Sequence, residues 1–78
     1  MNKKQRKKLE RIASQLEDLR SDLETISNEE NEKLDNIPVN LIGSDRYNDM
    51  WAVSDNLDEV IADLNNTINN LRNNVIYF

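Results

Sequence analysis

The chain has 78 residues, with 15 Asp and Glu against 10 Lys and Arg and a formal net charge of −5. A chain of this length forms one domain at most, spanning 1–78, and is close to the size at which self-association, a metal or disulfides usually supply part of the stability. It contains no cysteine and no histidine, which excludes disulfides, thiolate chemistry and the usual zinc ligands. We therefore expect no cofactor, and any metal site would consist of carboxylates alone.

The positive charges are gathered at the start of the chain. Six of the ten lie in the first eleven residues, whereas residues 12–63 hold three cations against fourteen acids. The basic start is not followed by an apolar segment, and no run approaches the roughly 18 apolar residues of a membrane span. We therefore expect a cytoplasmic protein that does not enter a membrane.

The first predicted element is a helix over about residues 3–36. Its apolar residues alternate at spacings of three and four, which places them on one face of a helix. Asn2 is a suitable N-cap with Gln5 three residues later, and the helix is expected to end near Asn36 in a left-handed C-cap. The apolar positions are Leu9, Ile12, Leu16, Leu19, Leu23 and Ile26.

A bend is predicted over residues 37–44, which contain the only proline and the only glycine of the chain. Gly43 allows the turn and Ser44 is a favourable N-cap for the next helix. We expect the bend to fix the register of the helices at its own acidic end and to leave the basic end looser. Three apolar bend residues are expected to fold back over the end of the helix pair: Val39, Leu41 and Ile42.

The second predicted element is a helix over about residues 45–76. Its apolar stripe is continuous and drifts slowly around the helix, as expected when 3.6 residues per turn is read against a seven-residue repeat. The two helices have nearly equal lengths, roughly 48 Å each at 1.5 Å per residue, which suits an antiparallel pair. The stripe consists of Met50, Val53, Leu57, Val60, Ile61, Leu64, Ile68, Leu71 and Val75.

These elements predict an all-α fold, a two-helix antiparallel coiled-coil hairpin. Two helices alone cover only part of each other's apolar stripes. We therefore expect either self-association, as a homodimer that forms a four-helix bundle or as a higher oligomer, or folding on a partner protein. The two stripes together form the predicted oligomer seam. Because that seam is aliphatic and carries no paired carboxylates, we do not expect an enzyme.

The basic start is a candidate nucleic-acid site, because cations displace the counterions of a phosphate backbone. The plainer alternative is a solubilising chain end, and the acidic remainder of the surface would repel DNA. The acidic body itself has two interpretations, a mimic of DNA that occupies a basic cleft or an ordinary solvated exterior. The candidate basic residues are Lys3, Lys4, Arg6, Lys7 and Lys8.

Four aromatic residues are candidates for contact with a partner protein. Tyr47 and Trp51 flank the stripe of the second helix, and Tyr77 and Phe78 end the chain beside the basic segment. Tyrosine and tryptophan are enriched among the residues that dominate binding at interfaces. Packing within the bundle is the alternative role for all four.

Residues 29–47, EENEKLDNIPVNLIGSDRY, resemble a family of small helical-hairpin proteins of phages and mobile elements of low-GC Gram-positive bacteria. The residues that differ from the family pattern are Val39, Ile42 and Gly43, where the family is more polar, and the asparagine-rich end of the second helix. The resemblance implies a phage-encoded helical hairpin in a bacterial host cell, without implying a mechanism. The matching residues are Leu34, Asp35, Asn36, Pro38, Asn40, Leu41, Ser44 and Arg46.

The function that we expect is that of a phage or prophage accessory protein which acts by protein–protein binding. Its partner would be a host or phage protein, and the effect would be inhibition or modulation of a host defence or nucleic-acid enzyme. The alternatives are a structural coiled-coil assembly module and a weak nucleic-acid binder that uses the basic end.

Overall fold

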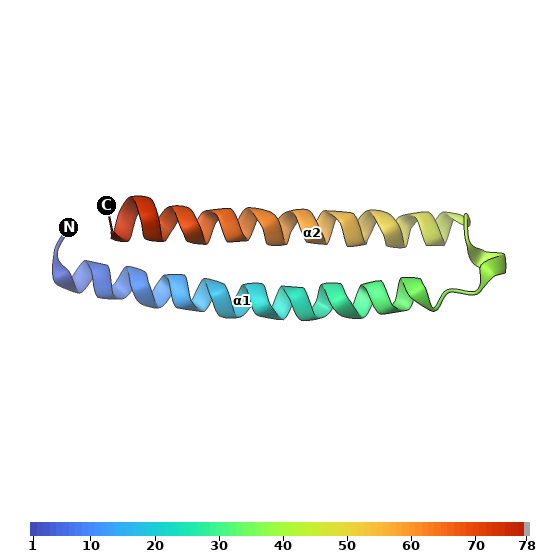
Figure 1. Ribbon diagram of the computed structural model, residues 1–78, viewed down its shortest axis with the longest axis horizontal. Coiled ribbons are helices and arrows are strands. Elements are labelled where there is room, and N and C mark those ends of the chain that lie inside the picture. Colours follow the sequence, from blue (N-terminus) through green and yellow to red (C-terminus); the bar gives the residue numbers. More distant parts are fainter. Residues whose placement is uncertain (78) are drawn as a thin grey trace.

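The computed structural model describes residues 1–77, which form two long antiparallel helices joined by a bend (Figure 1). The elements are α1 (Lys3–Asp35), the short 3₁₀ turn η1 (Val39–Leu41), α2 (Asp45–Leu71) and the wider π-helical turn η2 (Arg72–Ile76). The described residues contain no strand, so the predicted all-α hairpin is confirmed. The described residues form a rod of 60 × 16 × 12 Å, with the first and last of them at the same end of the rod (Figure 1).

Helix α1 begins with the predicted capping box. The Asn2 Oδ1 atom accepts a hydrogen bond of 2.8 Å from the Gln5 backbone N–H, and the Gln5 side chain accepts one of 3.2 Å from the Asn2 N–H. At the other end the left-handed C-cap prediction is wrong, since Asn36 has φ −99° and ψ 6°. Its side-chain amide instead donates to the Glu32 carbonyl at 2.9 Å, which satisfies an end carbonyl without a left-handed residue.

The bend does not cover the helix ends as predicted. Val39 is 84% exposed, and Leu41 and Ile42 are about half exposed. The reason is that η1 is a tight turn with its own hydrogen bonds, and it projects beyond the ends of the helices (Figure 1). Gly43 then adopts φ +89°, a backbone conformation that side chains with a Cβ rarely adopt.

Helix α2 begins at the predicted N-cap, where Ser44 Oγ accepts a 3.2 Å hydrogen bond from the Tyr47 N–H. At its other end the Tyr77 N–H donates to the carbonyl of Arg72, five residues earlier, at 3.0 Å. This turn holds one residue more than an α-helical turn. The buried position therefore moves from Val75, which is exposed, to Ile76, which is buried. Val75 therefore does not pack between the two helices, and its predicted place in the oligomer seam stays a prediction.

The two helices touch along a line of residues spaced seven apart. On α1 this line is formed by Ala13, Arg20, Ser27 and Leu34, and on α2 by Ser54, Ile61 and Ile68; all seven are buried or half-buried. Ala13, Ser27 and Ser54 are small, which lets the backbones approach closely. The line of contact therefore lies to one side of the predicted apolar stripes rather than along their centres.

Candidate interaction surfaces

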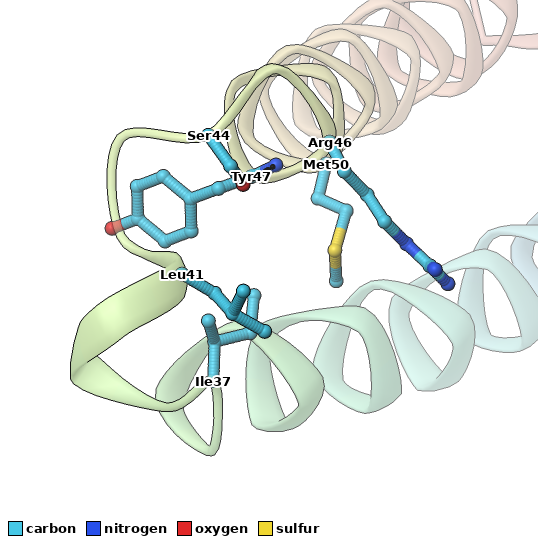
Figure 2. A pocket seen from close by; sticks show the side chains of 6 residues that line it. All are labelled: Ile37, Leu41, Ser44, Arg46, Tyr47 and Met50. Atoms are coloured by element: carbon cyan, nitrogen blue, oxygen red, sulfur yellow. Dashed lines mark hydrogen bonds between the residues drawn. The ribbon is translucent and has the colours of Figure 1, made fainter.

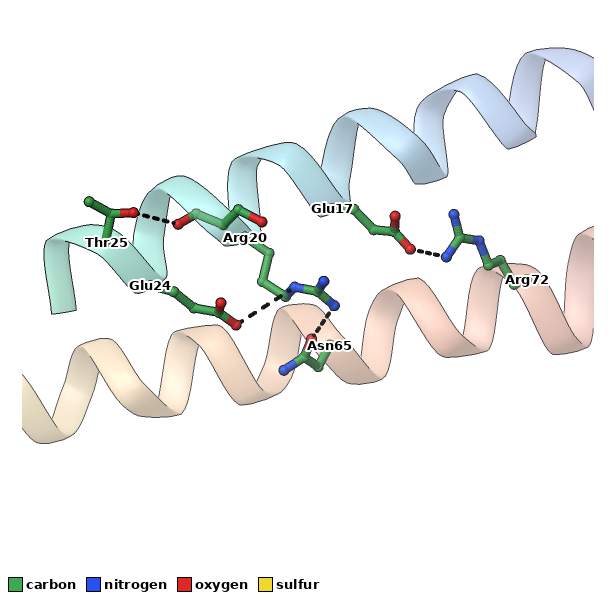
Figure 3. Close-up of polar contacts among 7 residues, drawn as sticks. Glu17, Arg20, Glu24, Thr25, Asn65 and Arg72 are labelled. Atoms are coloured by element: carbon green, nitrogen blue, oxygen red, sulfur yellow. Dashed lines mark hydrogen bonds and ion pairs between the residues drawn. The ribbon is translucent and has the colours of Figure 1, made fainter. Parts of the chain in front are cut away.

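One side of the hairpin, which we call the polar face, holds the helices together by hydrogen bonds and ion pairs. Each of its residues follows a residue of the contact line by four positions in the sequence, which is a rotation of about 40° around the helix. Figure 3 shows two of its interhelical contacts, from Arg20 to Asn65 and from Arg72 to Glu17. The residues of this face are Glu17, Glu24 and Asn31 on α1 and Asp58, Asn65 and Arg72 on α2.

Three hydrogen bonds fix the register of the helices. Ser27 Oγ donates to Asp58 Oδ1 at 2.8 Å, and Ser54 Oγ donates to Asn31 Oδ1 at 2.7 Å. Arg20 Nη1 donates to Asn65 Oδ1 at 2.7 Å. The residue numbers of each pair add up to the same value, 85, so all three bonds specify one alignment of α1 against α2.

The Arg20 guanidinium is only partly paired. Its Nε atom is buried and has no hydrogen-bond partner within the described residues. Glu24 Oε1 lies 3.8 Å from that atom, close enough for a charge interaction and too far for a hydrogen bond. The favourable contact of Arg20 across the hairpin is therefore the bond to Asn65.

The terminal end of the rod is tied together by two further contacts. Arg72 pairs with Glu17, and the Tyr77 hydroxyl donates to Glu10. The hydrogen bond from Arg72, aided by the charges of Arg72 and Arg20, lowers the pKa of Glu17 below its ordinary value. The bond to Glu10 raises the pKa of Tyr77. Both contacts join α1 to the end of α2 across the hairpin, while the greater looseness of this end relative to the bend stays a prediction.

The opposite side of the hairpin, which we call the apolar face, is open. A row of half-buried residues lies beside the contact line on this side. Beyond it lies an exposed row, in which each residue directly precedes a contact-line residue in the sequence. Residue i−1 lies 100° around a helix from residue i, and in two antiparallel helices that face each other this rotation leads to the same side of the pair. The face consists of Leu9, Ile12, Leu16, Leu19, Leu23 and Ile26 on α1 and Met50, Val53, Leu57, Val60, Leu64 and Leu71 on α2.

This face contains twelve of the fifteen predicted seam residues. Of the other three, Ile61 and Ile68 lie on the contact line and Val75 is displaced by the π-helical turn. Sequence reasoning missed Ala13, Ser27, Ser54 and Ile76, which are buried between the helices. The signal for Ala13 and Ser27 was the fourteen-residue spacing of two small residues on one helix, which an apolar pattern does not register.

A hollow of about 440 Å³ lies at the bend. Ile37, Leu41 and Met50 form its apolar lining, and Tyr47 and Arg46 stand at its edges (Figure 2). Tyr47 also makes an edge-to-face contact with the exposed Trp51, with ring centroids 6.3 Å apart and planes at 79°. The predicted partner residues Tyr47 and Trp51 therefore form one aromatic pair beside this hollow.

The predicted basic residues lie at the other end of the rod (Figure 1). All five lysines and arginines of residues 3–8 are exposed. A second hollow, of about 450 Å³, lies at this end and continues the apolar face, since Leu9 and Ile12 line it together with Met1, Gln5 and Lys8. Tyr77 is exposed at the same end, and Phe78 lies outside the described residues. The structure thus separates the two groups of predicted partner residues by the length of the rod.

Within residues 1–77 there is no group of three or more carboxylates placed to hold a metal ion. None of the helices in this part of the chain is both long enough and apolar enough to cross a membrane.

Comparison with known protein families, with curated protein sequences and with solved structures found no match to this chain. Function is therefore inferred from the geometry and charge of the chain itself.

Proposed function

We propose that this protein acts by protein–protein binding, with the apolar face as its binding surface and a second copy of the chain as its first partner. The observation that carries this proposal is the continuous, one-sided exposure of aliphatic residues. Leu19, at the centre of the α1 stripe, is 56% exposed, and Ile12 and Ile26 on either side of it are 44% and 48% exposed. Burying apolar surface stabilises a complex by roughly 25 cal/mol per Å². Packing of another apolar surface against this face is therefore favourable.

The apolar face of a second copy of the chain can pack against this face. Two hairpins related by a twofold axis bury the same residues on both copies and give a four-helix bundle. The rod measures 60 × 16 Å across its two longer dimensions, so the face offers at most about 960 Å². A standard protein interface buries about 800 Å² per partner. The available area therefore suffices for a stable homodimer.

We further propose that the dimer presents its acidic exterior to a host or phage protein with a basic surface, such as a nucleic-acid enzyme. Residues 19–66 carry twelve acids and three cations. Asp55, Glu59 and Asp63 of α2 are exposed and lie away from the apolar face. A surface of this charge accelerates encounter with a basic partner.

Sedimentation velocity tests the self-association. We expect the wild-type chain to sediment as a dimer at tens of micromolar, and Leu19→Glu to sediment as a monomer because it places a charge at the centre of the face. Ser14→Glu is the matched control, since it adds the same charge at an exposed position away from the face and should leave the dimer intact. A wild-type monomer under these conditions would refute the proposal.

The basic partner is tested by capture from host lysate followed by mass spectrometry. The bait is the wild-type chain, and the comparison bait carries Asp55→Asn, Glu59→Gln and Asp63→Asn. We expect proteins with basic surfaces to be captured by the first and lost with the second. An identical set of proteins on both baits would show that the acidic exterior does not select a partner.

A further inference from the structure

Charge is distributed unevenly along the rod. The register hydrogen bonds place Leu19 of α1 level with Asn66 of α2, near the middle of both helices. The terminal half, residues 1–18 and 67–77, carries seven Lys and Arg against three Asp and Glu, a net side-chain charge of +4. The bend half, residues 19–66, carries three against twelve, a net charge of −9.

We propose that the two copies in the dimer pack antiparallel, with their bends at opposite ends of the bundle and the twofold axis passing near Leu19. This inference rests on the proposed function, because it specifies how the second copy sits on the apolar face. The antiparallel arrangement sets the +4 half of each copy against the −9 half of the other. With both bends at the same end, halves of like charge would lie against each other.

The exposed row of the α1 stripe, formed by Ile12, Leu19 and Ile26, is symmetric about Leu19. Face-to-face packing about this axis lays α1 of one copy on α1 of the other, running in the opposite direction. Ile12 and Ile26 are each seven residues from Leu19, so each meets the other residue in the second copy. Apolar contacts alone do not choose this arrangement, because the stripes also match when both bends lie at one end.

Charges at the two ends of the same face make the choice. Lys8 lines the hollow at the terminal end. Glu30 is half-buried, continues the row of Leu9, Leu16 and Leu23 at the bend end, and has Lys33 Nζ at 3.1 Å. Both lie eleven residues from Leu19, so in the antiparallel dimer Lys8 of each copy reaches Glu30 of the other. In the alternative dimer Lys8 of each copy lies at the opposite end of the bundle from Glu30 of the other, so this pair cannot form.

These interactions act at short range. Packed helices lie about 8–10 Å apart, which is close to the screening length of about 8 Å at physiological salt. The opposite halves therefore still attract each other in the dimer, and the like halves of the alternative would still repel. The antiparallel dimer should weaken as salt is raised, whereas the alternative should strengthen.

Spin-label distances decide between the two arrangements. The chain has no cysteine, so one introduced cysteine carries one label per copy. Asn48→Cys lies near the bend, exposed on α2. Its two labels should be about 54 Å apart along the antiparallel bundle, because position 48 is eighteen residues from the axis at 1.5 Å per residue. The alternative dimer would hold them within about 30 Å, given helix spacings of roughly 10 Å.

Asn66→Cys is the control label. It is exposed and level with the axis, so its two labels are close together in either dimer. A short distance at position 66 with a long one at position 48 supports the proposal. Short distances at both positions would overturn the antiparallel arrangement and leave the dimer standing. If the spin labels show no dipolar coupling at either position, the dimer itself is refuted. This outcome distinguishes failure of the proposed self-association from failure of the antiparallel arrangement.

A charge swap gives an independent test. Lys8→Glu should raise the dimer Kd about tenfold, the size expected from two exposed ion pairs per dimer, and Lys8→Glu with Glu30→Lys should restore it. If Lys8→Glu leaves the Kd unchanged, or the double variant does not recover, Lys8 and Glu30 do not meet.

Discussion

At the scale of single residues, the hairpin depends on polar groups buried between its helices. Ser54 is 2% exposed, and its hydroxyl has Asn31 Oδ1 as its partner at 2.7 Å. A buried hydroxyl that loses its partner costs about 1–3 kcal/mol of stability. We expect Asn31→Leu to be destabilised by that amount in chemical denaturation. Adding Ser54→Ala should recover most of the loss; if it does not, the cost lies in the packing of position 31.

The Glu17–Arg72 pair predicts a dependence on pH. Its hydrogen bond holds the pKa of Glu17 below the ordinary value of 4.5. A carboxyl whose pKa is lower in the folded state contributes stability that is present above the unfolded pKa. That contribution is lost as the pH falls through the folded pKa. We therefore expect the difference in unfolding free energy between wild type and Glu17→Gln to shrink from pH 7 to pH 3.

The same pair is accessible to NMR titration of the Glu17 carboxyl. The wild-type pKa should lie below 4.5 and should rise in Arg72→Gln, which keeps a polar side chain and removes the charge. An unchanged pKa in this variant would mean that Arg72 is not the partner in solution.

At the scale of elements, local signals in the sequence were sufficient for the starts of both helices. The Asn2 capping box and the Ser44 N-cap depend on residues within four positions of each other, so they can be recognised without knowledge of the fold. The burial of Ile76 could not be recognised from the local sequence, because the π-helical turn arises where the end of α2 meets α1. The exposure of Val39 was missed since an apolar residue was assumed to be covered.

The bend offers a test of backbone strain without steric conflict. Gly43 has φ +89°, and a Cβ built there would have nothing within 4 Å. Gly43→Ala should therefore lose about 1–2 kcal/mol through the backbone alone. Gly43→Asn should lose less, because asparagine tolerates positive φ better. Equal losses for both variants, measured by urea denaturation, would indicate a side-chain clash or a different turn.

At the scale of the whole molecule, the apolar pattern predicted the hairpin but not which side of each helix faces the other. Aliphatic residues identify the surface that must leave water. They do not say whether the second helix or a second molecule covers it. Small residues such as Ala13 and Ser27 decide that question here, because they let the helices approach along a line that the large residues leave free. The open apolar face is the consequence.

That division of roles couples folding to association. The apolar core buried within one described hairpin consists of only Ala13, Leu34, Ile68 and Ile76. Most aliphatic side chains are covered only in the proposed dimer, so the dimer should supply much of the stability. By mass action the melting temperature should then rise with protein concentration. Each tenfold increase corresponds to about 1.4 kcal/mol per dimer, or roughly 5 °C for a domain of this size.

Thermal unfolding followed by circular dichroism from 2 to about 200 μM, a range over which mass action on a dimer acts measurably, checks this expectation. Leu19→Glu should melt at a lower temperature that does not depend on concentration, while Ser14→Glu should follow the wild type. A wild-type melting temperature that stays constant over this range, with a dimer present in sedimentation, would mean that the polar face and the small core hold a single hairpin by themselves. The dimer would then add a binding function to an already stable fold.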